Sequence, residues 1–210
     1  MYKYGLILLA TTACKSGNEN SQILEPDPIE DMSEENFVSY RIDFGSNGTA
    51  SDWFALNDDV MGGVSYGVVR YDENSVVFNG EVSTDNNGGF VSLRSPNSNF
   101  DLADYTDVEL SYRSYGHSFT MILAEYNAWY EPKFELEVMP VSEEWNTVSV
   151  PLDSFKQYAM TGIGEVETDV QLTSDILSSV LRIELMNTEF ESGEFELEID
   201  YIEFQGAVEP

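Results

Sequence analysis

The chain has 210 residues, with 39 Asp and Glu against 9 Lys and Arg, one His and one Cys, and a formal net charge of −30. This composition excludes a zinc site built from several His and Cys ligands, and it disfavours nucleic acid as a partner because phosphate binding requires clustered cations. A Ser-His-Asp triad would need His117, the only histidine, and a Cys-His pair would need Cys14, the only cysteine. The function classes that remain are carboxylate chemistry, binding of hard cations such as calcium, and binding without catalysis.

Residues 1–13 predict a bacterial lipoprotein signal peptide. A short basic start is followed by the apolar run Gly5–Ala10, which is too short to span a membrane, and then by small residues that lead to Cys14. Thr11 stands where such signals usually carry Leu. The alternatives are an ordinary signal peptide and a buried N-terminal strand. If Cys14 is lipidated, it anchors the protein to a bacterial envelope membrane, on the periplasmic or the outer surface.

A polar, acidic stretch covers residues 14–36 and contains two prolines. This composition predicts a flexible tether, which would reach about 25 Å from a membrane. The rest of the chain is richer in apolar residues, since hydrophobic residues make up 42% of the whole sequence and aromatic residues 13%. We therefore expect one folded domain over residues 37–206, with enough apolar material for a core.

Short runs of alternating apolar and polar residues begin at Phe37 and predict about ten strands. Strict alternation gives a strand one buried and one solvent-exposed face, as in antiparallel sheets. Two helical turns are predicted, near Leu152–Tyr158 and Thr173–Ser179. The fold class that follows is all-β, an antiparallel β-sandwich or jelly roll. The predicted strands are Phe37–Phe44, Val64–Tyr71, Ser75–Ser83, Phe90–Arg94, Asp107–Ser114, Ser118–Glu125, Lys133–Met139, Trp145–Leu152, Val180–Met186 and Glu194–Phe204.

The last predicted strand indicates where much of the net charge comes from. Phe195, Leu197 and Ile199 share one face of this strand, and acidic residues alternate with them on the other face. We expect most of the acidic residues to solvate strand faces and the tether. Acidic strand edges also discourage pairing between sheets of different molecules.

The densest unusual segment is Trp53–Ser65, whose centre reads Asn-Asp-Asp-Val-Met-Gly-Gly over residues 57–63. Asn and Asp side chains bond backbone N–H groups in turns, and glycines allow positive φ or close backbone approach. The Val-Met pair between them offers an apolar contact surface. A second glycine pair, Gly88-Gly89, opens a strand that ends in Arg94.

Three interpretations of this loop stay open. Asp58 and Asp59 cap backbone donors in a structural loop, or the loop forms a ligand or partner site with Arg94 nearby, or its oxygen atoms bind calcium. The candidate residues of a ligand or partner site are Trp53, Asn57, Asp58, Asp59, Met61, Gly62, Gly63, Ser65 and Arg94.

These motifs together resemble the complex I intermediate-associated protein family, over about residues 37–204. The resemblance rests on two glycine-containing segments, a Trp followed by a Val-Pro-Leu run, and the alternating last strand. The matching residues are Trp53, Asn57–Gly63, Ser65, Phe78–Gly80, Gly88–Phe90, Ser92, Arg94, Trp145, Val150–Leu152, Phe155, Gly193–Phe195, Leu197–Asp200 and Ile202.

The resemblance implies a galactose-binding-like jelly roll related to carbohydrate-binding modules, in agreement with the strand count. It also implies a protein that is not an enzyme, because members of the family are not known as enzymes. The eukaryotic member is an assembly chaperone for complex I. This chain departs from that setting, because its first residues predict secretion and lipidation, whereas the peripheral arm of complex I is assembled on the other side of the membrane.

One segment of the last strand suggests catalysis instead. Glu198, Asp200 and Glu203 fit the E-x-D-x-x-E spacing of some jelly-roll β-glucanases, in which a pair of carboxylates hydrolyses the glycosidic bond. On a regular strand Glu203 points away from the face of Glu198, unless a bulge intervenes. A jelly-roll glycoside hydrolase that uses Glu198 and Glu203 is therefore an alternative.

Several other residues attract attention. Tyr126, Trp129 and Tyr130 lie between two predicted strands, where such rings either stack on sugar faces or close the rim of the sandwich. His117 is predicted to lie at a strand edge or to face solvent. Arg94 and Arg113 are predicted to pair with acidic residues.

The sequence thus predicts a non-enzymatic binding domain on the bacterial envelope, whose partner is a protein or a carbohydrate. No cofactor and no metal is included in this prediction. An assembly factor for a respiratory membrane complex is a further alternative. The surfaces to examine are the Asn57–Ser65 loop, Arg94 and the aromatic residues at 126, 129 and 130.

Overall fold

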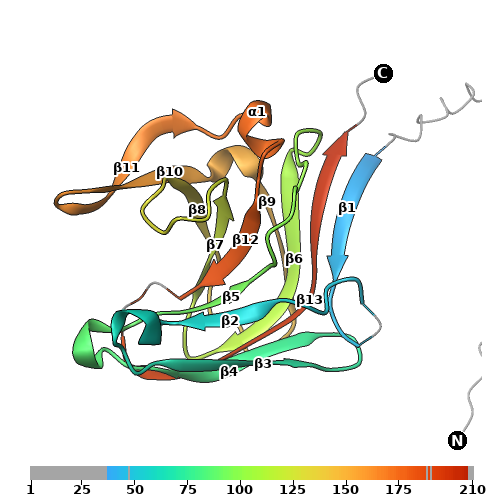
Figure 1. Cartoon of the computed structure of the whole chain (residues 1–210). Helices are drawn as coiled ribbons and strands as arrows, with labels where there is room; N and C mark the ends of the chain where they lie inside the picture. The colour runs from blue at the N-terminus through green and yellow to red at the C-terminus, as the bar shows by residue number, and fades with distance from the viewer. Residues whose placement is uncertain (1–36, 47, 188, 190, 208–210) are drawn as a thin grey trace, which may run out of the picture. The chain divides into compact units, whose positions relative to one another are not determined.

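The computed structural model describes residues 37–46, 48–187, 189 and 191–207. The predicted signal peptide, its Cys14 and the predicted tether lie outside the described residues. The described part belongs to one compact unit, Glu35–Pro210, in which two antiparallel sheets pack face to face (Figure 1). The predicted all-β fold class is confirmed. Within this part of the chain, no helix is long and apolar enough to cross a membrane.

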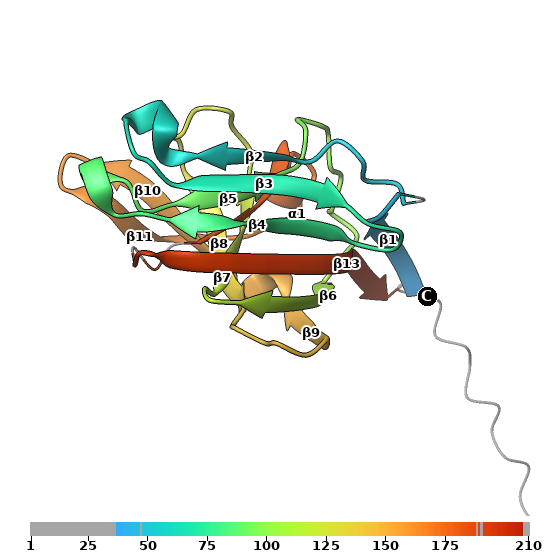
Figure 2. The ribbon, with the colours of Figure 1, turned by 90° about the horizontal axis from the view of Figure 1, so that it is seen from below.

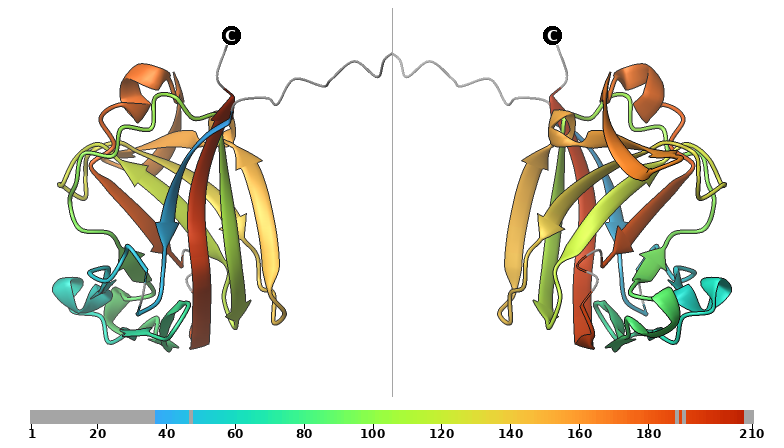
Figure 3. Two further views of the ribbon diagram at one scale, coloured as in Figure 1. Left: turned by 90° about the vertical axis from the view of Figure 1, so that its right-hand side faces the viewer. Right: turned by 90° about the vertical axis from the view of Figure 1, so that its left-hand side faces the viewer.

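The first sheet has six strands, in the order β3-β4-β13-β6-β9, with β1 paired to the second half of β13. Figures 2 and 3 show these strands side by side. The long β13 holds the sheet together because it pairs with three other strands. The bounds are β1 (Phe37–Asp43), β3 (Tyr66–Tyr71), β4 (Val76–Val82), β6 (Asp107–Tyr115), β9 (Asn146–Pro151) and β13 (Gly193–Ala207).

The second sheet has seven strands, in the order β11-β10-β8-β7-β12-β5-β2. It bends so that the β10–β11 hairpin and the β2 end project toward the same side (Figure 1). Its strands are β2 (Phe54–Asn57), β5 (Val91–Arg94), β7 (Phe119–Ala124), β8 (Lys133–Met139), β10 (Lys156–Thr161), β11 (Gly164–Gln171) and β12 (Arg182–Met186), and the helical turns are η1 (Asp58–Met61), η2 (Asp85–Asn87), η3 (Leu152–Ser154) and α1 (Ser174–Leu177).

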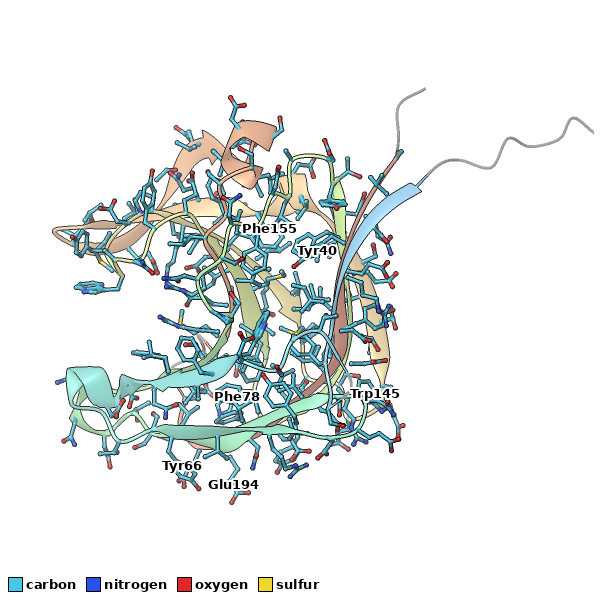
Figure 4. All side chains as sticks on the ribbon, turned by 45° about the vertical axis from the view of Figure 1, so that its right-hand side comes forward. Tyr40, Tyr66, Phe78, Trp145, Phe155 and Glu194 are labelled. Carbon is cyan, nitrogen blue, oxygen red and sulfur yellow. The ribbon has the colours of Figure 1, made fainter. Side chains whose placement is uncertain are left out.

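The core fills the space between the two sheets with alternate residues of their strands. Phe78, Phe119 and Phe195 form an aromatic cluster there, with ring centroids 4.9–6.2 Å apart. In Figure 4, Phe78 and Phe155 lie between the sheets, whereas Tyr66 and Glu194 point away from them. The alternation of apolar and polar residues therefore predicts correctly which side chains of these strands face the core.

All ten predicted strands are confirmed, but three further strands were not predicted. β2 has only four residues, and β10 and β11 form a hairpin exposed on both faces, so none of them carries a clear alternation signal. The helical turn predicted over Leu152–Tyr158 is wrong beyond η3, because the chain is a strand again from Lys156. The turn predicted over Thr173–Ser179 contains α1.

A bulge in β13 changes which side chains face the solvent. Ile199 pairs with Tyr112 of β6 and Tyr201 pairs with Ser111, so Asp200 is an extra residue in the ladder. Beyond this point the buried residues are even-numbered, beginning with Ile202. The bulge therefore turns Glu203 toward the same outer face as Glu198.

The packing predicts that truncating two aromatic residues on neighbouring strands has very different effects on the stability of the fold. Phe78 of β4 is 0% exposed, whereas Tyr66 of β3 is 54% exposed. We expect Phe78→Ala to lower the free energy of unfolding by about 3–5 kcal/mol, because it leaves a cavity in the core. Tyr66→Ala, the matched control, should change it by less than about 0.5 kcal/mol. Urea denaturation followed by tryptophan fluorescence measures both, and equal losses would contradict this packing.

Candidate functional site

The carboxylate of Asp58 is buried where the two sheets meet. Oδ1 accepts a hydrogen bond from Ser65 N at 3.0 Å, and Oδ2 accepts from Ser65 Oγ at 2.5 Å and from Gly89 N at 2.7 Å. Ser65 Oγ in turn accepts from Ser83 N at 2.9 Å. Asp58 thus connects the segment after β2 to the segments before β3 and β5, and Ser65 extends the connection to the residue after β4.

The glycines of the motif make room for this carboxylate. A Cβ on Gly63 would lie 2.3 Å from Asp58 Cγ, and a Cβ on Gly88 would lie 2.4 Å from Asp58 Oδ2. Gly62 has a φ of 90°, in the left-handed region that ends the η1 turn. Any larger residue at position 63 or 88 would therefore displace Asp58.

The environment of Asp58 favours its ionised form. Burial alone would raise the pKa of this carboxyl, but the hydrogen bonds from the Ser65 hydroxyl and from the N–H groups of Gly89, Ser65 and Phe90 outweigh burial and lower the pKa below its ordinary value. At neutral pH Asp58 is therefore a buried anion whose partners are mostly backbone donors.

Two further side chains connect β2 to β3 across the gap between the sheets. Asn57 accepts from Gly67 N at 3.1 Å and donates to Gly67 O at 3.5 Å, as a strand neighbour would. Tyr71 Oη accepts a hydrogen bond from Trp53 N at 2.9 Å. The Trp53 ring is buried and packs edge-on against Phe44, with centroids 5.1 Å apart.

The candidate loop therefore divides into inner and outer residues. Trp53, Asp58, Gly63 and Ser65 are buried, while Asp59 and Gly62 are exposed. In the described part of the chain, no group of three or more His, Cys, Asp or Glu side chains is arranged to hold a metal ion.

The structure also separates Arg94 from this loop. Asn57 pairs with Val91 at one end of β5, and Phe54 pairs with Arg94 at the other end. Because Arg94 lies five residues beyond Gly89, the two are about 16 Å apart along the strand. Arg94 belongs instead to the outer face of the seven-stranded sheet.

That outer face carries one continuous row of side chains across neighbouring strands. The register pairs Phe54 with Arg94, Arg94 with Glu184, Glu184 with Ile122, Ile122 with Glu135, and Glu135 with Lys156. Five interstrand steps separate β2 from β10, so the row spans about 24 Å. We call this surface the concave face, because the sheet bends around it (Figure 1).

The two halves of the row are held by ion pairs. Glu184 accepts from Arg182 Nε at 2.7 Å through Oε1, and its Oε2 lies 3.0 Å from Arg94 Nη2. Lys133 Nζ lies 2.9 Å from Glu135 Oε1 and 3.3 Å from Glu165 Oε1. Lys156 Nζ lies 2.8 Å from Glu167 Oε1.

Burial changes the titration of the Lys133–Glu135 pair. Burial raises the pKa of Glu135, and the nearby carboxylates of Glu165 and Glu184 add to this effect, while Lys133 opposes it. Burial would lower the pKa of Lys133, but Glu135 and Glu165 reverse the effect and raise it. Lys133 therefore stays charged at neutral pH.

The aromatic loop between β7 and β8 lies beside the middle strands of the row. Trp129 is 66% exposed, and its ring meets Tyr130 edge-on at 5.9 Å. Arg182 Nη1 donates to Asn127 Oδ1 at 3.1 Å, and Asn97 Nδ2 donates to the same oxygen at 2.7 Å. The buried Arg182 thus fixes both Glu184 and the loop that carries the exposed rings.

Two depressions lie on the concave face. The first, of about 50 Å³, has Arg94, Tyr126, Trp129, Lys133 and Glu184 among its lining residues. The second, of about 310 Å³, is lined by Thr120, Glu135, Leu136, Glu137, Lys156 and Tyr158. The structure therefore brings Arg94 together with Tyr126 and Trp129, and Tyr130 packs on Trp129.

Sequence reasoning missed the charged residues of this face. Lys133-Phe-Glu135-Leu and Arg182-Ile-Glu184-Leu repeat one pattern, a cation and a glutamate two residues apart on an otherwise apolar strand. Such a pattern resembles an ordinary solvent face. The sequence did contain one indication of a binding face, namely a strand with both a cation and a glutamate on one face, followed or preceded by an aromatic loop.

The carboxylates Glu198 and Glu203 lie on one face but far apart. Their partners on β6 are Arg113 and Glu109, which are four residues and about 13 Å apart. Two-carboxylate glycosidases need about 5–9.5 Å between the carboxyl groups. Glu198 is also buried and bound to Ser75 Oγ at 2.7 Å and Arg113 Nε at 2.6 Å. This pair therefore does not have the geometry of a hydrolase site.

Of the two positions predicted for His117, the solvent-facing one is wrong. The residue is 4% exposed, and its Nδ1 lies 2.9 Å from Glu189 Oε2, which also places Glu189 beside Ser118. Burial at the start of β7, next to Gly193, replaces the solvent-facing position expected from the sequence.

The comparison with protein families gives one match. The family described as Complex I intermediate-associated protein 30 (CIA30) matches residues 42–199, which is 158 of the 210 residues of the chain. Among curated proteins, none matches the sequence.

The solved structures with a similar fold include carbohydrate-binding modules. The solution structure of CtCBM11 is 15% identical, covers 80% of this chain and 96% of that chain, and has a TM-score of 0.54. A family 11 module from Clostridium thermocellum, in complex with a β-1,3-1,4-mixed-linked tetrasaccharide, is 18% identical over 83% of this chain and 91% of that chain, with a TM-score of 0.47. At these identities the likeness establishes the fold alone.

The hydrogen bonds of Asp58 predict a large effect of a small substitution. We expect Asp58→Asn to lower the free energy of unfolding by at least about 2 kcal/mol, since a hydrogen bond to a charged group contributes roughly 1.5–3 kcal/mol. Asp59→Asn, on the exposed neighbour, is the matched control. Urea denaturation at pH 7 measures both variants, and equal stability of the two would refute the role of the Asp58 carboxylate.

The pKa of Asp58 predicts a pH dependence. Because the folded-state pKa is lower than the unfolded value of about 3.9, this stabilisation is complete above about pH 4 and is lost as the pH falls through the folded-state pKa. The difference in stability between the wild type and Asp58→Asn should therefore be constant between pH 5 and 7 and shrink at lower pH. A difference that is the same at pH 3 and pH 7 would argue against this assignment.

Proposed function

This chain belongs to the Complex I intermediate-associated protein 30 (CIA30) family, and we propose that it is a non-enzymatic binding domain whose concave face binds a carbohydrate. The observation that carries the proposal is the depression where Arg94, Glu184 and Trp129 meet. An exposed ring next to fixed charged groups is the arrangement that sugar recognition requires, because a sugar has both an apolar face and a rim of hydroxyl groups.

The exposed rings supply the surface for stacking. Trp129 and Tyr126 line the depression that contains Arg94, and the half-buried Tyr158 lines the second depression. Phe54 is 46% exposed and stands next to Arg94 in the register. The middle of the row is buried, so an oligosaccharide would contact this face at its two depressions.

The charged groups of the row supply hydrogen bonds to hydroxyls. Glu184 and Glu135 accept, and Arg94 and Lys133 donate, each in a position fixed by its ion-pair partner. Hydrogen bonds from charged groups are about twice as strong as neutral ones. Side chains that are already ordered also lose little conformational entropy when the ligand binds.

A protein partner is the second candidate, since the family is named for complex I intermediates. It would make the chain an assembly factor for a respiratory membrane complex. Affinity purification from detergent-solubilised envelopes distinguishes the two candidate functions. The assembly-factor candidate predicts that respiratory subunits are recovered with the chain, and the carbohydrate proposal predicts that none is recovered.

The setting we propose is the bacterial envelope. Cys14 is the only cysteine, and it follows an apolar run and three small residues, as lipidation requires. The acidic composition of residues 15–36 supports a tether between the lipid and the folded domain.

The first test of the carbohydrate proposal is a matched pair of tryptophan variants. Trp129→Ala removes the exposed ring of the concave face, and we expect it to weaken binding to a retained polysaccharide at least about tenfold. Trp145→Ala is the control, because Trp145 is 46% exposed on the other sheet, where Arg113 lies 5.3 Å from its ring.

Affinity electrophoresis of the full chain in gels that contain soluble polysaccharides, together with a glycan array, gives the readout. Retardation of the wild type and of Trp145→Ala but not of Trp129→Ala supports the proposal. An equal loss with both variants, or no retention by any glycan, overturns it.

The anchor has its own test. Cells that express the full chain should incorporate radioactive palmitate into the wild type and not into Cys14→Ser, and only the wild type should fractionate with membranes. Equal labelling of the two proteins would disprove lipidation at Cys14.

A further inference from the structure

We propose that the ligand of the concave face is an uncharged glycan, and that the face excludes polysaccharides that carry carboxylate or sulfate groups. This inference rests on the proposed function, and it follows from the way the cations of the molecule are used. It names the class of ligand that the same site accepts.

Every lysine and arginine of the described residues is already paired. The chain has nine such residues, and the seven outside residues 1–36 all take part in ion pairs with Asp or Glu. Four of the seven lie on the concave face, namely Arg94, Lys133, Lys156 and Arg182. An anionic ligand would therefore find no unpaired cation there.

The two arginines cannot be released at low cost. The side chains of Arg182 and Glu184 are 10% and 5% exposed, and that of Arg94 is 18% exposed. An anion that took Arg94 from Glu184 would leave a buried carboxylate with fewer partners, and an unpaired buried charge is strongly unfavourable. The pairs thus act as fixed polar groups and not as a reserve of positive charge.

Carboxylates outnumber cations on this face. Glu131 and Glu137 line the two depressions, and neither belongs to an ion pair among the described residues. With Glu135, Glu165, Glu167 and Glu184, they make six carboxylates against four cations. A polyanion would be repelled both by this surplus and by the net charge of −30.

Hydroxyl groups suit the same surface. A carboxylate has about four acceptor sites. The buried Glu184 already faces Arg182 Nε, Arg182 Nη2 and Arg94 Nη2, whereas Glu135 uses only part of its sites in the ion pair with Lys133. A hydroxyl can donate to such a free site and accept from a remaining guanidinium N–H, without breaking the pair. The exposed Glu137 adds a further acceptor for a hydroxyl.

The experiment compares one glycan in two charge states. A neutral polysaccharide retained in affinity electrophoresis is oxidised at C6, so that its primary alcohols become uronates on an unchanged backbone. We expect the full chain to bind the oxidised form at least about tenfold more weakly at low salt, and the gap to narrow in 0.5 M NaCl because salt screens the repulsion. The double variant Glu131→Gln and Glu137→Gln should also narrow the gap.

The outcomes separate the two proposals. Binding of the oxidised form as tight as that of the neutral form, or a glycan array on which only acidic glycans are bound, overturns the inference and leaves glycan binding intact. No retention by any neutral or acidic glycan overturns the proposed function and the inference with it. A gap that salt and the double variant leave unchanged shows that size, not charge, rejects the oxidised form, and this also contradicts the inference.

Discussion

A single buried carboxylate holds together the corner of the sandwich where the two sheets meet. Asp58 follows β2 of the seven-stranded sheet, and its partners precede β3 and β5, with Ser83 of the β4 end joined through Ser65. The cost of burying the charge is met because several donors converge on it, most of them backbone N–H groups that would otherwise be unpaired. The glycines at 63 and 88 are part of the same constraint, since they leave the space that the carboxylate fills. The concave face depends on this corner, because β2 and β5 begin or end there and carry Phe54 and Arg94 at their other ends.

The segment with the most distinctive sequence and the surface with the features of a binding site are therefore different parts of the molecule. A motif of Asn, Asp and Gly residues is distinctive because its backbone geometry tolerates few substitutions, and here that geometry serves folding. The concave face is built from common residues, and its chemistry depends on which strands lie side by side. Glu184 and Glu135 belong to strands separated in the chain by about fifty residues, yet only Ile122 stands between them in the register. The family resemblance accordingly identifies the fold better than it identifies the ligand.

Strands whose apolar and polar residues alternate could be predicted from the sequence, and strands without this alternation could not. In β13 the carboxylates and apolar residues alternate so regularly that its inner face could be predicted up to Ile199. The bulge at Asp200 has no local signal, because it depends on how β6 pairs with both halves of the strand. β10 and β11 escaped prediction because a hairpin exposed on both faces needs no apolar stripe. Of the candidate site, Trp129, Tyr126 and Arg94 could be proposed from residue type, whereas Arg182 and Glu184 became visible only through the register.

The ion pairs of the concave face limit the means by which this face can recognise a ligand. Four cations in a strongly acidic protein would suggest an electrostatic attractor, if they were free. They are paired instead, so the face gains little long-range attraction and keeps a fixed pattern of donors and acceptors. Side chains held by ion pairs keep a fixed position, and a fixed set of hydrogen-bonding groups selects its ligand by geometry. Exposed rings next to such a row, Trp129 above all, would add affinity without adding charge, since stacking depends on apolar contact. The surface is thus suited to a ligand that matches it by shape and hydroxyl positions, and its acidic surplus acts against ligands that would bind only through their negative charge.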